Sequence, residues 1–205
     1  MAYPTVSAPY GFKPINRQDG MPYAGATTQY GITSVSTAIY NGDLVYITGG
    51  TISKSGVTSN AISTGNLTAG VFMGCQYVNT QGQTVQAQYY PGNAAASSAI
   101  AYVVVDANAA FKVAVTNGSG AVSSTTVKAI GVNLAVDQTT AGSTTTGDSG
   151  EGVTAPTAGA GNAVTLPVKV ISVVPETAVN ATNFSEVVVV LTNPQITRTT
   201  GNDFA

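Results

Sequence analysis

Several kinds of residue are missing or scarce in this chain of 205 residues, and each absence excludes a class of function. Histidine does not occur, which removes Ser-His-Asp and Cys-His catalysis and every metal site with imidazole ligands. The single cysteine, Cys75, permits neither an intrachain disulfide nor a thiolate cluster, and its neighbours Phe72, Met73 and Tyr77 are typical of an inert buried thiol. Tryptophan is absent too, which disfavours a sugar-binding surface, because sugar faces stack well on large aromatic rings.

Charge is equally scarce. Seven Lys/Arg and nine Asp/Glu make up 8% of the chain, whereas an average soluble domain carries roughly a quarter. The basic residues are spread from Lys13 to Arg198 without a cluster, so nucleic acid is not an expected partner. A surface so poor in charge has little electrostatic protection against association. We therefore expect a protein that works in contact with other protein.

Long hydrophobic runs are lacking as well. The longest, residues 100–105 and 187–191, are far shorter than the roughly 20 residues of a membrane helix, so no membrane partner is expected. The first residues have neither a basic start nor a continuous apolar stretch, and we expect no secretory signal and synthesis in the cytoplasm. Hydrophobic residues nevertheless reach 43%, which excludes a disordered chain.

What the chain does contain is a strand pattern. Val, Thr, Ile and Tyr dominate, and Gly, Asn and Ser clusters recur about every ten residues, which is typical of a β-sandwich or barrel. We expect strands at 39–40, 44–48, 51–54, 70–78, 84–90, 100–105, 112–116, 168–174 and 187–191. The last two are nearly continuous Val/Ile/Leu, which predicts burial on both faces. Only 93–99 and 123–130 are compatible with helical turns.

The predicted fold is therefore all-β, with a single β-barrel or β-sandwich core over residues 38–192. An extended Pro/Gly-rich arm (1–37) precedes the core, a long Thr/Gly-rich loop (137–163) interrupts it, and a polar tail (193–205) follows it. Proline prevents regular pairing in the arm whereas its five aromatic rings favour burial, and an arm laid on a neighbouring surface satisfies both. The candidate partner-binding residues are Tyr3, Tyr10, Phe12, Lys13, Arg17, Tyr23 and Tyr30.

No constellation for chemistry emerges from the motifs. The Gly-Lys pair of a P-loop is absent, and Lys54-Ser55-Gly56 resembles a β-lactamase element without the Ser-x-x-Lys that would supply a nucleophile. Asp43 and Asp106 are in turn-like settings where Asp caps its own backbone, and residues 147–151 lack the ligand spacing of a calcium loop. We expect no catalytic residues, no cofactor and no metal, and hence not an enzyme.

Short segments distributed over almost the whole chain carry a resemblance. They are Ser7-Ala8-Pro9-Tyr10-Gly11-Phe12-Lys13-Pro14, residues 20–27, Tyr40-Asn41-Gly42-Asp43-Leu44-Val45, and residues 70–75, 89–91, 111–113, 139–147, 166–170 and 187–193. Together they resemble the small structural proteins of tailed phages, notably marine and cyanobacterial podoviruses. The chain is also similar, more loosely, to β-barrel decoration proteins that stand as trimers on capsids.

The resemblance implies a capsid decoration (cement) protein on the virion surface. Its partners would be the outer face of the major capsid protein and neighbouring copies of itself, arranged as a trimer. Cementing a shell requires contact area rather than catalytic groups, and many weak contacts on a lattice add up to strong binding. Two alternatives remain: another structural virion component (tail, fibre or shell), and a carbohydrate-binding surface module.

Overall fold

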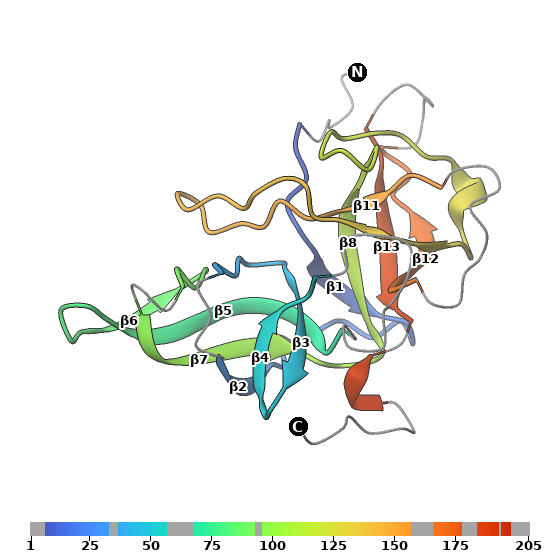
Figure 1. The fold of residues 1–205 in the computed structure, drawn as a ribbon. Helices are drawn as coiled ribbons and strands as arrows, with labels where there is room; N and C mark the ends of the chain where they lie inside the picture. Colours follow the sequence, from blue (N-terminus) through green and yellow to red (C-terminus); the bar gives the residue numbers. More distant parts are fainter. Residues whose placement is uncertain are drawn as a thin grey trace.

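The computed structural model describes residues 7–32, 37–56, 68–92, 96–156, 166–177, 184–192 and 194–197. Within these ranges the regular structure is all β-strand, apart from two three-residue 3-10 turns, η1 (Val127–Ala129) and η2 (Gln195–Thr197). The predicted all-β barrel fold is confirmed, but the strands form two barrel-like sheets rather than one (Figure 1). None of the helical turns in the described ranges is long and apolar enough to cross a membrane.

The first sheet, which we call the N-terminal barrel, is a closed ring of five strands. They are β2 (Thr28–Ile32), β3 (Leu44–Thr48), β4 (Thr51–Lys54), β5 (Gly70–Asn79) and β7 (Ala96–Val104). Strand β3 pairs with both β4 and β5, β4 runs parallel to β2, and β7 lies between β2 and β5. The ring is completed where Leu44 pairs with Val71, so no strand in it lacks a second neighbour.

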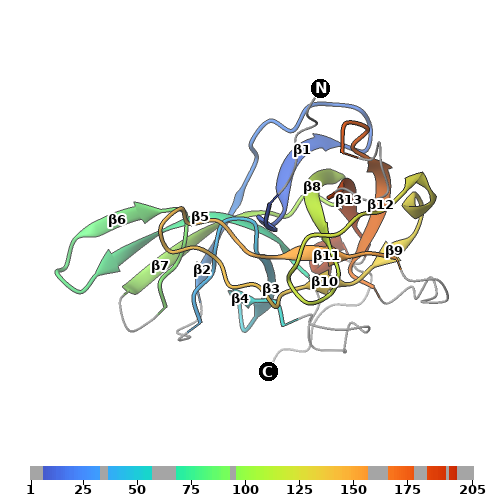
Figure 2. The same cartoon turned by 90° about the horizontal axis from the view of Figure 1, so that it is seen from above.

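Beyond the ring, β5 and β7 continue outward as a wing. The wing consists of the far half of β5, the first residues of β7 and β6 (Thr84–Ala87), which pairs with β5 alone. Strand β2 accompanies β7 only from Ile100 to Val103, so residues 96–99 lie outside the ring. Figures 1 and 2 show the wing projecting from the rest of the molecule, with β6 along its outer margin.

The second sheet, the C-terminal barrel, is built around the long strand β8 (Ala109–Thr116). Its other members are β1 (Lys13–Arg17), β9 (Asn133–Leu134), β10 (Val136–Asp137), β11 (Gly152–Thr154), β12 (Val168–Val173) and β13 (Glu186–Leu191). Strands β1 and β11 occupy successive halves of the same edge of β8, and β13 pairs along the opposite edge. The ring closes through the consecutive strands β9 and β10, which pair with β12 and β11.

Each barrel has its own hydrophobic cluster, because alternate side chains of every strand point inward. The cluster of the N-terminal barrel includes Ile39, Ile52, Phe72 and Tyr90. The larger cluster fills the C-terminal barrel and also takes in Leu44, Val71 and Val104 from the first sheet. The two barrels therefore share apolar packing where they meet.

The predicted strands 44–48 and 51–54 match β3 and β4, and most of the others match to within a few residues. Strand β13 is buried on both faces as expected, whereas β12 alternates, with Lys169 and Ser172 exposed. The expected turn at 123–130 contains η1. At 93–99, residues 96–99 belong to β7, and residues 93–95 lie outside the described part.

The segments predicted as arm and loop contribute strands. Residues 13–17 form β1 of the C-terminal barrel, and residues 28–32 form β2 of the N-terminal barrel. From the 137–163 segment, β11 joins β8, while residues 157–163 lie outside the described part. Proline did not prevent pairing, because β1 pairs with β8 alone and its register is irregular between Pro14 and Asn16. Proline is tolerated at such edges and irregularities of a sheet.

Candidate functional site

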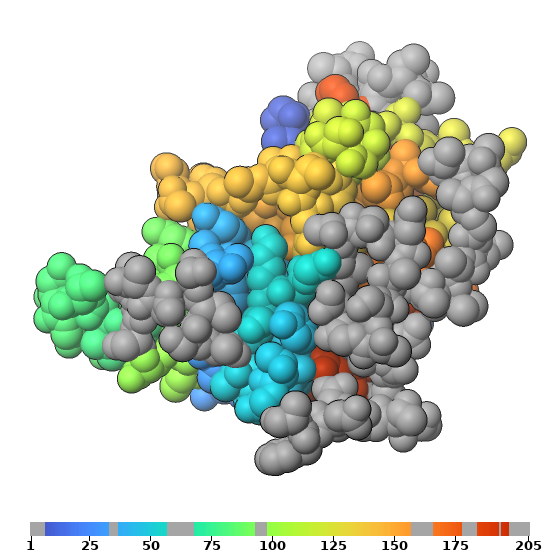
Figure 3. Space-filling view, viewed as in Figure 1, coloured from blue at the N-terminus to red at the C-terminus, as the bar shows by residue number. Residues whose placement is uncertain are grey.

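Three segments that are distant in sequence meet between the two barrels, and we call this meeting point the hub. They are residues 10–13, 40–44 and 148–151, and in Figure 3 the gold 148–151 region lies directly above the light-blue region of residues 40–44. The Gly11 amide donates to the Glu151 carbonyl at 2.9 Å, and the Phe12 amide donates to the Gly42 carbonyl at 3.0 Å. The hub is thus held by backbone hydrogen bonds between otherwise separate parts of the chain.

Two glycines allow these backbones to approach so closely. Gly11 and Gly42 both have positive φ (79° and 97°), a conformation that side chains disfavour. A Cβ on Gly11 would lie 2.6 Å from the Ser149 Cβ and 2.9 Å from the Gly42 carbonyl oxygen. Part of the predicted arm is therefore packed into the centre of the molecule.

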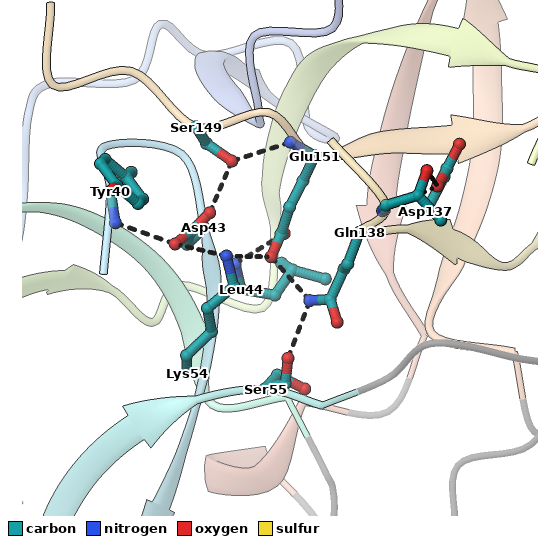
Figure 4. A network of polar contacts seen from close by, with 10 residues as sticks. Tyr40, Asp43, Leu44, Lys54, Ser55, Asp137, Gln138, Ser149 and Glu151 are labelled. Carbon is teal, nitrogen blue, oxygen red and sulfur yellow. Dashed lines mark hydrogen bonds and ion pairs between the residues drawn. The ribbon is translucent and has the colours of Figure 1, made fainter. Parts of the chain in front are cut away.

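A buried ionic cluster lies in the hub, where β3, β4 and the 138–151 segment meet (Figure 4). The Lys54 ammonium is 2.9 Å from an Asp43 carboxylate oxygen and 3.5 Å from a Glu151 oxygen. Both carboxylates are fully buried, and the Lys54 side chain is 21% exposed. Two carboxylates that are out of contact with water thus share one ammonium.

Each of the four oxygens of the two carboxylates accepts a hydrogen bond. Asp43 accepts from the Tyr40 amide at 2.8 Å and from the Ser149 hydroxyl at 2.5 Å. Glu151 accepts from the Leu44 amide at 3.0 Å and from the Gln138 side-chain amide at 2.6 Å. Because buried charges are tolerated only when paired and hydrogen-bonded, this network fixes how the 138–151 segment sits on β3 and β4.

The surroundings of Glu151 shift the pKa of its carboxyl group. Burial, then the negative charge of Asp43, raises the pKa of Glu151 from its ordinary 4.5 to about 8, against the opposing attraction of Lys54. The Glu151 and Asp43 charges outweigh burial and raise the pKa of Lys54, which keeps the ammonium charged. Glu151 therefore holds a proton near neutral pH.

The cluster is a structural joint in this fold. Carboxylates, an ammonium group and a serine hydroxyl are the components of many hydrolytic sites, but Asp43, Ser149 and Glu151 are buried and already bonded to one another or to the backbone. No group of three or more His, Cys, Asp or Glu side chains in the described ranges is placed to hold a metal ion. What the cluster does is fasten one barrel to the other.

Of the candidate partner-binding residues, Tyr10, Phe12 and Lys13 make contacts within the fold, and Phe12 alone of the three is buried. Phe12 is fully buried, with its ring edge-on to that of Phe111 at 6.5 Å, so it cannot touch a partner. The Tyr10 hydroxyl donates to Glu186 at 2.5 Å, and the Lys13 ammonium lies 2.7 Å from Asp148. Burial, then the hydrogen bond to Glu186, raises the Tyr10 pKa.

The other candidate residues are used near the surface. Arg17 lies 3.3 Å from Asp19 and 3.5 Å from Asp106, which itself caps the turn before β8. Tyr23 packs against the larger cluster and Tyr30 against the smaller one, both partly buried. Tyr3 lies outside the described residues. The structure brings Tyr10 to Lys13 together at the hub and leaves Arg17, Tyr23 and Tyr30 apart from it.

The charged residues are divided unequally between the barrels. Between Asp19 and Asp106 the sequence has only Asp43 and Lys54, the pair buried in the hub. The outer surface of the N-terminal barrel therefore carries almost no charge. The C-terminal barrel presents Lys128, Lys169 and Glu176, which form no ion pair within the described part of the chain.

Sequence reasoning missed Glu151, Lys54 and Gln138 as members of one cluster. A signal existed, because Lys54 ends a predicted strand in a stretch almost free of charge, and a lysine that is buried there requires an opposite charge nearby. Which carboxylate supplies it depends on the contact between residues 54 and 151, which the strand pattern does not encode. Cys75, expected to be an inert thiol, is buried, and burial raises its pKa to about 12.

In comparisons with models of protein families, with curated proteins and with solved structures, nothing matches this chain.

Proposed function

We propose that this protein is a decoration protein of a tailed-phage capsid, which binds the outer face of the major capsid protein and cements neighbouring subunits. The observation that carries the proposal is the uncharged N-terminal barrel, whose two charged residues are paired beneath its surface. A protein free in solution normally keeps about a quarter of its surface charged to prevent association. A barrel without that protection suits permanent contact with other protein.

The division of charge suggests an orientation on the shell. The N-terminal barrel faces the capsid, and the C-terminal barrel, which carries the unpaired charges, faces solvent. Strand β7 provides an apolar contact on the neutral side, because Ile100 is 40% exposed and shares the outer face of the sheet with Gln29 and Tyr102. The sequence resemblance to phage structural proteins points to the same function independently.

Binding of the recombinant protein to purified expanded capsids tests the proposal. We expect saturable binding at many copies per shell, changing less than about twofold between low and high salt, since screening has little to act on in a neutral contact. Ile100→Lys places a charge on the neutral face and should abolish binding. Ile130→Lys, at the 49% exposed Ile130 of the C-terminal barrel, is the matched control and should bind normally.

Three results would contradict the proposal. They are failure of the native chain to bind, equal binding of the two lysine variants, or a few copies per particle, which would indicate a tail or fibre component. Deletion of residues 1–37 is not a suitable test, because it removes β1 from one barrel and β2 from the other.

A further inference from the structure

The wing ends in an open sheet edge. Strand β6 pairs with β5 on one side, and no strand of the described part pairs with its other side. The same edge forms the outer margin of the wing in Figure 2. An edge of this kind presents a row of backbone donors and acceptors that can pair with another chain.

The direction of the backbone groups of β6 follows from the hairpin. The Asn79 amide donates to the Gln83 carbonyl at 2.9 Å, and the same register pairs Tyr77 with Val85. Because such bonds alternate along an antiparallel pair, Val85 and Ala87 bond to β5, whereas Thr84 and Gln86 direct their N–H and C=O groups outward. Two residues of β6 are thus ready to accept a further strand.

The usual protection of an open edge is missing here. Natural sheets guard their edges with lysine, other charges, proline or bulges. Residues 55–105 contain no Asp, Glu, Lys or Arg, and β6 itself reads Thr-Val-Gln-Ala, in regular register with β5. Apart from its length of four residues, nothing in β6 opposes the approach of a second strand.

We propose that β6 pairs with β6 of a second copy of this chain, antiparallel across a twofold axis. Val85 faces Val85 of the other copy in a non-hydrogen-bonded pair, and Thr84 is opposite Gln86 on both sides. This register uses the outward N–H and C=O groups of Thr84 and Gln86 in four hydrogen bonds. It ends where β6 ends, at Ala87, before the segment in which Gly147 packs against Gln88.

A second copy fits this edge better than a partner of a different chemistry. Identical surfaces usually repel each other through like charges, and this surface has none. Two four-residue strands bury far less area than a stable complex in solution requires, so the contact is weak for free molecules. It becomes effective when copies are held close together, because the local concentration is then high.

Disulfide trapping tests the register directly. In a Cys75→Ala background, Val85→Cys provides a single thiol, and oxidised glutathione accepts the two electrons when two copies join through one S–S bond. Residues in a non-hydrogen-bonded pair have Cα atoms about 4.5 Å apart, within the range of a disulfide. We expect a covalent dimer of V85C to form at least roughly tenfold faster than one of T84C, whose partner across the axis is Gln86.

A difference in accessibility cannot explain faster cross-linking of V85C than of T84C. Thr84 is exposed whereas Val85 is half-buried, so accessibility alone would favour cross-linking of T84C. Equal rates, a faster T84C, or no dimer would overturn the proposal, and the last result would assign the edge to a different protein. Because the isolated chain is used, the outcome does not depend on whether a capsid is the partner.

A second measurement avoids any change at Cys75. By sedimentation at high protein concentration, the native chain should show weak self-association, which Val85→Lys abolishes and Ile130→Lys leaves unchanged. Identical sedimentation of the native chain and the Val85→Lys variant would overturn the proposal.

Discussion

At the scale of single residues, the most unusual feature is a cation shared by two buried acids. Asp43 is 2.9 Å from Lys54 and Glu151 is 3.5 Å from it, and both carboxylates are fully buried. If both acids were ionised, the cluster would hold one uncompensated negative charge, which is costly away from water. A proton on Glu151 removes that charge, which explains the direction in which its pKa moves.

The stability of the protein should therefore fall as the pH rises from about 5 to about 8. The pKa of Glu151 is raised from 4.5 to about 8 in the folded state, so between these values the folded chain keeps a proton that the unfolded chain has released. Raising the pH through this window destabilises the folded state by an amount on the order of a few kcal/mol. Above about pH 8 Glu151 is ionised in both states, and stability falls no further on its account. Denaturant unfolding between pH 5 and 9 measures it.

Glu151→Gln should flatten this pH dependence, since the amide cannot ionise. Glu176→Gln is the matched control, because Glu176 is exposed and without an ion pair in the described part, and it should keep the native slope. A slope in the Glu151→Gln variant as steep as in the native chain would contradict the assignment. Asp137 and Asp148 act oppositely, because their pKa values are lowered and their contribution is lost only in acid.

Gly11 should be far less tolerant of substitution than its conformation alone suggests. Gly11 and Gly20 have nearly the same φ, 79° and 81°, but a Cβ on Gly20 meets nothing within 4 Å. Gly20→Ala should cost about 1 kcal/mol of stability, the strain of a left-handed residue with a side chain. Gly11→Ala adds a collision with Ser149 and Gly42 and should cost roughly 3 kcal/mol or more. Thermal unfolding of both variants distinguishes the cost of backbone strain from the cost of the steric clash. Equal losses of stability would show that the residues around Gly11 move to accommodate a Cβ.

At the scale of elements, the side chain of Gln195 makes the backbone hydrogen bonds that a neighbouring strand would otherwise make. Beyond Val45, β3 loses its pairing with β5, and the Gln195 side chain replaces the missing neighbour. Its amide group accepts from the Ile47 N–H and donates to the Ile47 carbonyl, both at 2.7 Å. The segment after β13 thereby returns from the C-terminal barrel to the N-terminal one.

Gln195→Ala should destabilise the protein by about 1–2 kcal/mol, since it leaves two backbone groups of Ile47 without their partner. Gln81→Ala, in the exposed turn of the wing, is the control and should change stability little. Hydrogen exchange provides a local readout, in which the Ile47 amide should exchange faster in Gln195→Ala. Unchanged exchange at Ile47 would mean that the two hydrogen bonds of the Gln195 side chain contribute nothing to stability.

Element by element, the sequence predicted what alternation and turns encode. Strands 44–48 and 51–54 were recovered because Gly49-Gly50 is an unambiguous hairpin turn between β-branched runs. β1 and β2 were missed because Pro14, Pro22 and nearby glycines suggested an arm. Their pairing depends on β8 and β7, which are distant in the sequence. Local pattern identifies a strand, but a strand with a weak pattern is recognised only through its partner.

At the scale of the whole molecule, the scarcity of charge was visible in the sequence, but its distribution was not. Composition alone indicated a protein that associates with others. The fold adds that one barrel keeps its only two charged residues in the hub, while exposed charges gather on the other. The hub itself was beyond reach of the sequence, since Gly11, Asp43, Lys54 and Glu151 come together only through the arrangement of both barrels.

The route of the chain through the two barrels has a consequence for the order of assembly during synthesis. All five strands of the N-terminal ring have been made once residue 104 is complete, so this barrel can close early. Strand β1, made first, can dock only when β8 exists, and the second ring must wait for β13 near the other end of the chain. Contacts of such long sequence separation form slowly. A nascent chain released early would thus carry one finished barrel and the unpaired strands of another.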